Sequence, residues 1–169
     1  MVAVLGRSEI LKLIRAKPPL IEGYVDLEVQ LQPSGFDLTL REVRIFESSG
    51  SIDFDNSRRE LPTTSQLEFK DDFLILKPGA YLVVFNEVIN MPLNIVAIGR
   101  PRSSLLRAGA TVESAVWDPG YSGRSKALLL VFNPRGIRLY RNARILQLVF
   151  LRVLGDVGEG YRGVYQGER

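Results

Sequence analysis

Arginine and serine residues gather in one short segment, residues 99–107, which reads Gly-Arg-Pro-Arg-Ser-Ser-Leu-Leu-Arg. The segment directly follows an apolar run, residues 93–98, that is typical of a buried strand. Serine hydroxyls and free backbone N–H groups at the start of a turn or helix can bind an anion, and arginine adds charge-assisted hydrogen bonds. The same residues also suit a serine-capped helical turn with surface arginines, so both interpretations stay open.

A second segment, residues 116–123, places a carboxylate and a phenol around one tight turn. It reads Val-Trp-Asp-Pro-Gly-Tyr-Ser-Gly, and Asp118-Pro119-Gly120 is a common turn sequence. Asp118 and Tyr121 could hold a small polar ligand, with Asp118 orienting a water molecule as a general base. A plain turn is the simpler interpretation, and the local sequence by itself favours it.

Asp37 interrupts an apolar strand pattern within residues 32–38, Gln-Pro-Ser-Gly-Phe-Asp-Leu. A carboxylate in such a position is often the structural partner of a buried arginine. We therefore expect Asp37 to form an ion pair and not to catalyse.

The last residues, 155–169, are rich in glycine, tyrosine and charge. Tyr161 and Tyr165 stand between glycines and could close over a flat ligand by stacking. Taken alone, the composition favours disorder.

The composition excludes several kinds of chemistry. Histidine and cysteine are both absent, so there is no histidine base, thiolate nucleophile, disulfide or Cys/His zinc site. The 22 Lys and Arg residues against 19 Asp and Glu give a net charge of +3 without a dense basic stripe, so no nucleic-acid partner is expected. No apolar stretch approaches the roughly 18 residues that span a membrane, so we expect no membrane partner and a cytoplasmic location.

The elements that must position these groups are mostly strands. One short helix is expected at residues 8–17, where Ser8 can cap it and Pro18 ends it. Residues 25–31 alternate between apolar and polar side chains, which is typical of a half-buried strand, and residues 67–76 indicate a hairpin. Further short apolar runs between Gly and Pro turns predict an all-β sandwich or barrel-like fold.

The chain of 169 residues has the length of one domain and shows no linker. We expect a β domain over residues 1–154 with a polar surface excursion at residues 48–62. Residues 155–169 are expected to form a flexible C-terminal tail.

Five segments, taken in order, resemble the sequence motifs of the family of trimeric dUTPases and dCTP deaminases. They are QPSGFDL at residues 32–38, GRPRSSLLR at 99–107, AVWDPGYSG at 115–123, NARILQLVF at 142–150 and YRGVYQG at 161–167. The match extends over residues 8–169, and the opening helix is similar to the deaminase branch. The resemblance implies an all-β, jelly-roll-like (β-clip) fold assembled as a homotrimer. It also implies active sites between subunits and a C-terminal tail that closes over the nucleotide.

The resemblance further implies which residues bind the nucleotide. Tyr121 would pack on the deoxyribose, and the backbone of the hairpin at residues 110–117 would bind the pyrimidine edge. Tyr165 and Gln166 of the tail would contact the substrate. The residues expected at the phosphates are Arg102, Ser103, Ser104, Arg107 and Gln147.

Asp118 stands at the position of the catalytic aspartate in the family. An ionised aspartate can orient a water molecule and accept its proton during attack on the α-phosphorus. Asp37 would orient an arginine. Mg2+ would bind through the substrate phosphates, with no direct protein ligand.

The strand after the Asp-Pro-Gly turn distinguishes the two activities of the family. Deaminases of this branch work without zinc and use a glutamate in that strand, which is residues 126–132 here. Alignment from Asn133 places Leu130 at the glutamate position, and alignment from Asp118 places Leu128 there. Leucine cannot transfer protons, and the short hairpin before the turn is also more similar to dUTPases. We therefore predict a dUTPase that hydrolyses dUTP to dUMP and pyrophosphate, built on a deaminase-like scaffold.

Two alternatives stay open. One is a dCTP deaminase, or a bifunctional dCTP deaminase and dUTPase, in which Glu113 of the hairpin acts as the base. The other is a non-catalytic nucleotide-binding member of the fold. The retained Ser103, Asp118 and Tyr121 argue against the second.

Overall fold

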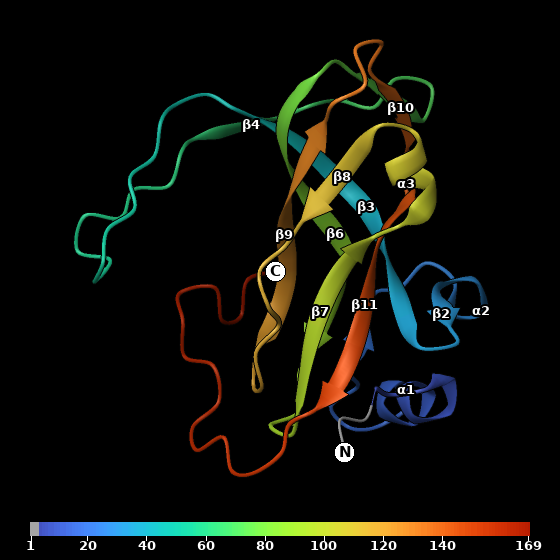
Figure 1. Cartoon of the computed structure of the whole chain (residues 1–169), viewed down its shortest axis with the longest axis vertical. Helices are drawn as coiled ribbons and strands as arrows, with labels where there is room; N and C mark the ends of the chain where they lie inside the picture. Colours follow the sequence, from blue (N-terminus) through green and yellow to red (C-terminus); the bar gives the residue numbers. More distant parts are fainter. Residues whose placement is uncertain (1–3) are drawn as a thin grey trace.

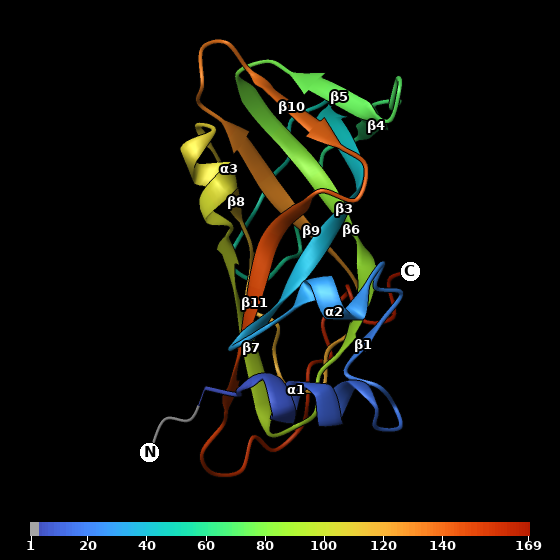
Figure 2. The same ribbon diagram turned by 90° about the vertical axis from the view of Figure 1, so that its right-hand side faces the viewer.

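The computed structural model describes residues 4–169 as an antiparallel β fold with short helices (Figures 1 and 2). The helices are α1 (Arg7–Ile14), α2 (Leu27–Gln30) and α3 (Ser103–Arg107). The strands are β1 (Ile21–Glu22), β2 (Leu31–Gln32), β3 (Gly35–Phe46), β4 (Thr64–Gln66), β5 (Phe73–Leu76), β6 (Gly79–Asn90), β7 (Ile95–Pro101), β8 (Ala110–Glu113), β9 (Ser122–Val131), β10 (Ile137–Tyr140) and β11 (Arg144–Arg152). No helix within residues 4–169 is both long and apolar enough to cross a membrane. The prediction of an all-β chain is confirmed.

Nine strands form one nearly closed sheet whose main path runs β7-β11-β3-β6-β9-β8. The short strands β1, β2 and β4 pair with β6 and β3, and β5 with β10 forms a separate ribbon. The two ends of the path meet where Ala97 of β7 exchanges two backbone hydrogen bonds of 3.0 Å with Trp117, just beyond β8. This junction places the segment that carries Asp118 against β7.

Apolar side chains from facing strands fill the interior of the sheet. Phe36 of β3, Phe85 of β6 and Phe150 of β11 are completely buried and are its largest members. Burying a side chain of this size contributes about 1.5–3 kcal/mol. The sheet that carries the turn at Asp118 is therefore stabilised by a well-packed core.

The first helix is shorter than predicted. It begins at Arg7 and ends at Ile14, and Gly6 occupies the N-cap position without a side-chain hydrogen bond. The prediction that Ser8 caps this helix is wrong, because Ser8 already lies within its first turn.

The prediction of a strand at residues 25–31 is also wrong, because residues 27–30 form α2. The Asp26 side chain accepts a hydrogen bond of 3.1 Å from the backbone N–H of Val29, which caps the helix. The buried Gln30 side chain accepts hydrogen bonds from the backbone N–H groups of Val25 (2.7 Å) and Asp26 (2.9 Å). These side-chain bonds to the backbone replace those of a strand.

The predicted hairpin at residues 67–76 is only half correct. The turn at Asp71-Asp72 is present, because Lys70 and Phe73 exchange two backbone hydrogen bonds of 3.1 Å across it. Residues 73–76 also form a strand, β5, but this strand pairs with β10 and not with residues 67–69. The strand before it is β4, which pairs with β3.

The polar excursion is present as a long arm, residues 47–63, that extends away from the sheet between β3 and β4 (Figure 1). Backbone hydrogen bonds between Ser51 and Glu60, of 2.9 and 3.0 Å, hold its two sides together. The base of the arm returns to the sheet beside β6 and β9 and forms one wall of the site described below.

Glu87 of β6 is a completely buried carboxylate at the centre of the sheet. It accepts hydrogen bonds from Gln30 Nε2 (2.7 Å), the backbone N–H of Thr39 (3.0 Å) and Thr39 Oγ1 (2.6 Å). Burial raises the pKa of Glu87 above its usual 4.5, and these hydrogen bonds oppose the rise. The folded chain therefore binds this proton more tightly than the unfolded chain does.

From this difference we expect a pH-dependent contribution to stability. The contribution of Glu87 is greatest below pH 4.5 and falls as the pH rises through the raised pKa of the folded chain. The free energy of unfolding of the wild type, measured relative to Glu87→Gln in urea, should decrease over that range. A difference between the two proteins that does not change with pH would contradict this expectation.

Candidate active site

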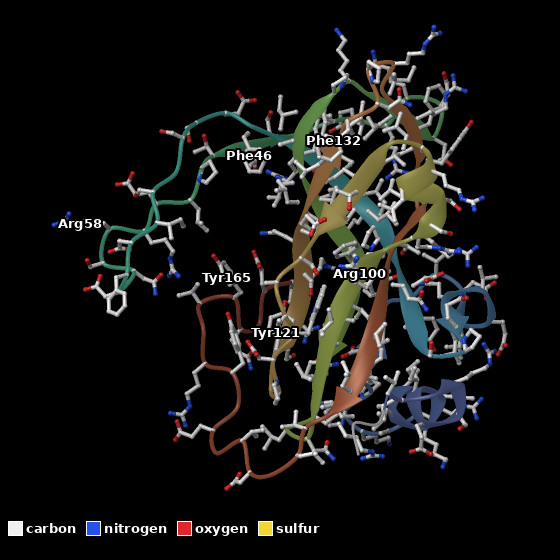
Figure 3. The ribbon with its side chains drawn as sticks, viewed as in Figure 1. Phe46, Arg58, Arg100, Tyr121, Phe132 and Tyr165 are labelled. Atoms are coloured by element: carbon white, nitrogen blue, oxygen red, sulfur yellow. The ribbon has the colours of Figure 1, made fainter. Side chains whose placement is uncertain are left out.

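A cavity of about 560 Å³ lies between the turn that carries Asp118, the base of the arm and the C-terminal tail. Figure 3 labels one residue from each wall, namely Tyr121, Phe46 and Tyr165. The other lining residues are Leu61, Pro62, Thr64, Leu82, Ala115, Val116, Trp117, Asp118, Ser125, Lys126, Tyr161 and Glu168. Mostly apolar walls with a few polar groups are typical of a small-molecule site.

The turn at Asp118-Pro119-Gly120 is fixed to its surroundings by backbone hydrogen bonds. Gly120 N–H donates to the carbonyl of Met91 (3.1 Å), and Met91 N–H donates to the carbonyl of Tyr121 (2.7 Å). Gly120 has a φ of +82°, and a Cβ at this position would lie 2.9 Å from Cα of Gly160 in the tail. The segment is therefore a tight turn, as the simpler interpretation had it, and it also presents the exposed Asp118 at the rim of the cavity.

Tyr121 and Trp117 flank Asp118 and both line the cavity. The Tyr121 ring contacts the Tyr161 ring edge to face, with centroids 5.5 Å apart. Burial raises the pKa of the Tyr121 phenol, and a hydrogen bond with Ser125 opposes the rise. Tyr121 is therefore neutral at physiological pH and offers the cavity a flat apolar ring.

The C-terminal tail lies along the first residues of β9. The side chain of Gln166 accepts a hydrogen bond from Ser122 N–H (2.9 Å) and donates one to the carbonyl of Gly120 (3.0 Å). Glu168 accepts a backbone hydrogen bond from Arg124 (2.6 Å) and pairs through its carboxylate with Lys126. Tyr165 lines the cavity, whereas the amide of Gln166 is used to anchor the tail. A direct contact between Gln166 and substrate stays a prediction.

Replacing Gln166 by alanine should release the tail locally. Loss of its two hydrogen bonds lowers the free energy of local opening by about 1–2 kcal/mol, so trypsin should cleave after the exposed Arg162 roughly tenfold faster. Gln32→Ala, which removes an amide bonded to Val29 far from the tail, serves as the control. Equal cleavage rates in wild type and Gln166→Ala would show that this anchor does not hold the tail.

The residues predicted at the phosphates lie in a second group around α3 and the neighbouring strands. Asp37 of β3 is buried and forms ion pairs with Arg102 and, at 3.2 Å, with Arg144. Burial raises the pKa of Asp37, and the two guanidinium groups oppose the rise. Gln147 stands opposite Asp37 on β11. Asp37 thus forms ion pairs with two arginines, and Arg144 is a partner that the sequence did not indicate.

The helix α3 begins directly after Arg102, whose side chain does not cap it. Ser103 and Ser104 lie inside this helix, after its N-cap residue Arg102, so the alternative interpretation of a serine-capped turn is wrong. Ser103, Ser104 and Arg107 are exposed. The side chains remain free to meet an anion. Arg100, labelled in Figure 3, lies near the end of β7 that leads into α3.

The two groups do not share a cavity within one chain. None of the residues predicted at the phosphates lines the cavity beside Asp118. The structure thus brings Asp118, Tyr121 and Tyr165 together and keeps the α3 group apart from them.

Residues 4–153 match the family model described as dCTP deaminase-like. The chain belongs to the dCTP deaminase-like family. The matched range contains the first four of the five segments quoted above, and the fifth, residues 161–167, follows it.

Within the dCTP deaminase-like family, the chain has close archaeal relatives. It is 53% identical over 167 residues to a probable deoxyuridine 5'-triphosphate nucleotidohydrolase of Methanosarcina mazei, covering 98% of both chains. It is 54% identical over 166 residues to a protein of the same name from Archaeoglobus fulgidus, covering 98% of this chain and 97% of the relative.

Two solved structures share the fold. The 2'-deoxycytidine 5'-triphosphate deaminase of Agrobacterium tumefaciens has a TM-score of 0.65 and 22% identity over 90% of this chain, which spans about half (49%) of that deaminase. The native EIAV dUTPase has a TM-score of 0.50 and 15% identity, covering 97% of this chain and 98% of its own. The jelly-roll-like, dUTPase-like fold class is confirmed.

In the dCTP deaminase-like family, the acidic groups at the cavity bear on the choice between hydrolysis and deamination. Leu128 and Leu130 of β9 are half-buried, and Glu113 is exposed opposite Leu128 and does not line the cavity. The carboxylates that line it are Asp118 and Glu168, and Glu168 is paired with Lys126. Sequence reasoning missed Glu168, Lys126 and Ser125, since no motif marks them.

Proposed function

We propose that this chain hydrolyses dUTP to dUMP and pyrophosphate. The archaeal relatives that carry this activity in their names align with nearly the whole chain at 53–54% identity. The geometric observation that carries the proposal is Asp118 at the rim of the cavity, beside a strand β9 without acidic residues. These groups suit hydrolysis better than deamination, which requires a proton-transferring group at the pyrimidine.

In the proposed reaction, the Asp118 carboxylate orients a water molecule and accepts its proton. The water oxygen forms a bond to the α-phosphorus, and the bond from that phosphorus to the bridging oxygen breaks. Pyrophosphate leaves with the bonding electron pair, and Asp118 returns its proton to solvent. Tyr121 supports the sugar, and the backbone of residues 110–117 binds the pyrimidine.

We propose that the complete site forms between subunits of a homotrimer. The separation of the α3 group from the cavity supports this arrangement, because phosphate-binding residues must lie near the water that Asp118 activates. A neighbouring copy would supply Arg102, Ser103, Ser104, Arg107 and Gln147. The tail, residues 155–169, would then close over the bound nucleotide.

Mg2+ stays a prediction as the cofactor. It would bind the oxygens of the triphosphate, and when bound it neutralises charge on the leaving pyrophosphate. Residues 4–169 contain no group of three or more acidic side chains arranged around a common point, so no residue of this chain is assigned as its ligand. A cytoplasmic location also stays a prediction.

Separate incubations with dUTP and with dCTP, both with Mg2+, test the proposed function. We expect dUMP and pyrophosphate from dUTP, with dCTP unchanged. Formation of dUTP or dUMP from dCTP would instead support the deaminase or bifunctional alternative and direct attention to Glu113 and Glu168. Binding of dUTP without turnover would support the non-catalytic alternative.

A further inference from the structure

Ser125 is a buried hydroxyl in a position that packing alone does not explain. On β9 the other inward positions are Gly123, Ala127, Leu129 and Val131, which are small or apolar. The buried polar side chains among residues 4–169 are Gln30, Asp37, Thr39, Glu87 and Ser125, and Ser125 is the member that lines the cavity. A buried polar group of this kind requires hydrogen-bond partners.

Its partners are the two aromatic residues on either side of Asp118. The indole Nε1 of Trp117 donates a hydrogen bond of 2.6 Å to Ser125 Oγ. The hydroxyl of Tyr121 lies 3.4 Å from the same oxygen. A serine hydroxyl accepts two hydrogen bonds and donates one, so a single oxygen can hold both rings.

The rings matter because Asp118 itself has no side-chain support within residues 4–169. Its carboxylate forms no hydrogen bond or ion pair there, so its position depends on the backbone of residues 117–121. The Trp117 backbone is fixed to Ala97, and a Cβ at Gly99 would lie 3.0 Å from the indole Cζ3. The indole is therefore confined between β7 and Ser125.

We propose that Ser125 is a positioning residue for Asp118, because its hydroxyl fixes Trp117 and Tyr121 and thereby the turn between them. The inference rests on the proposed hydrolysis of dUTP for its kinetic part. Its structural part concerns the free protein and can be measured without nucleotide.

Trp117 is the single tryptophan of the chain, so tryptophan fluorescence reports directly on this contact. In Ser125→Ala we expect a red-shifted emission maximum and stronger quenching by acrylamide, because water replaces the lost acceptor. Ser122→Ala removes a hydroxyl from the opposite side of the same strand, where it bonds Asn90 (2.7 Å), and should leave the emission unchanged. An unchanged emission maximum in Ser125→Ala would overturn the proposal.

The kinetic effect should fall on kcat. Misplacement of Asp118 in Ser125→Ala should lower kcat for dUTP about tenfold and change KM less than about threefold. In a Trp117→Phe background, which lacks the indole donor, Ser125→Ala should reduce kcat little further. Reductions that multiply in the double variant would overturn the proposal, as would a wild-type kcat in Ser125→Ala.

The two sets of measurements separate this proposal from the proposed function. A wild-type protein that hydrolyses no dUTP contradicts the proposed function. The emission comparison still decides whether Ser125 holds Trp117. Thermal unfolding of each variant, with the assays run well below the midpoint, separates a local effect from a loss of folded protein.

Discussion

Asparagine in place of Asp118 is expected to lower kcat for dUTP by at least about 100-fold, while Kd for dUTP changes less than about threefold. The amide has nearly the shape of the carboxylate but cannot accept the proton of the attacking water. Asp118 is exposed at the rim of the cavity and supports no other side chain, so the fold should be unaffected. Pyrophosphate release measures kcat, and calorimetric titration with dUTP measures Kd.

Asp71→Asn is the matched control for this substitution. Asp71 is exposed before β5, away from the cavity, and its φ of 49° is a left-handed conformation that asparagine also tolerates. This control should keep wild-type kcat and Kd. Full activity in Asp118→Asn would remove Asp118 from the mechanism, and loss of dUTP binding in that variant would assign it to binding instead.

The parts of the site that the sequence predicts are those encoded by local geometry. The turn at Asp118-Pro119-Gly120 depends on residue types within four positions, so the sequence indicates that Asp118 and Tyr121 lie close together, and both line the cavity. Ser125 and Lys126 have no such signal, because their importance depends on which residues the fold brings near them. The arm contributes cavity residues for the same reason, although its sequence indicates only a polar excursion.

In the fold as well, features encoded by neighbouring residues are predicted and features that depend on distant residues are not. Continuous apolar runs at residues 81–85, 127–132 and 145–154 predict the strands β6, β9 and β11, because such runs are typical of buried strands. Residues 25–31 alternate between apolar and polar side chains, but residues 27–30 become helical because Asp26 and Gln30 bond to nearby backbone groups. Strand pairing between β5 and β10 joins residues about sixty positions apart, and apolar patterns do not specify partners at that distance.

The cavity group with Asp118 and the α3 group lie apart within one chain. We therefore expect that two variants, each inactive by itself, regain activity when they assemble together. One is Asp118→Asn, which damages the cavity group. The other combines Ser103→Ala with Arg107→Ala, which removes from α3 two exposed side chains that we propose bind the phosphates and leaves the buried Asp37 ion pair intact. Each alone should lose at least about 100-fold in activity, because charge-assisted hydrogen bonds and the general base both act on the reacting phosphate.

Equal amounts of the two variants, refolded together, should recover about one quarter of wild-type activity. If Asp118 of one copy works with α3 of a neighbour, random assembly places an intact Asp118 beside an intact α3 at about a quarter of the sites. Light scattering should give three times the chain mass of 19.0 kDa for every sample. Variants mixed without refolding should stay inactive. A refolded mixture that also stays inactive would mean that both groups of each site come from the same chain, and the α3 group would then have to move toward the cavity when dUTP binds.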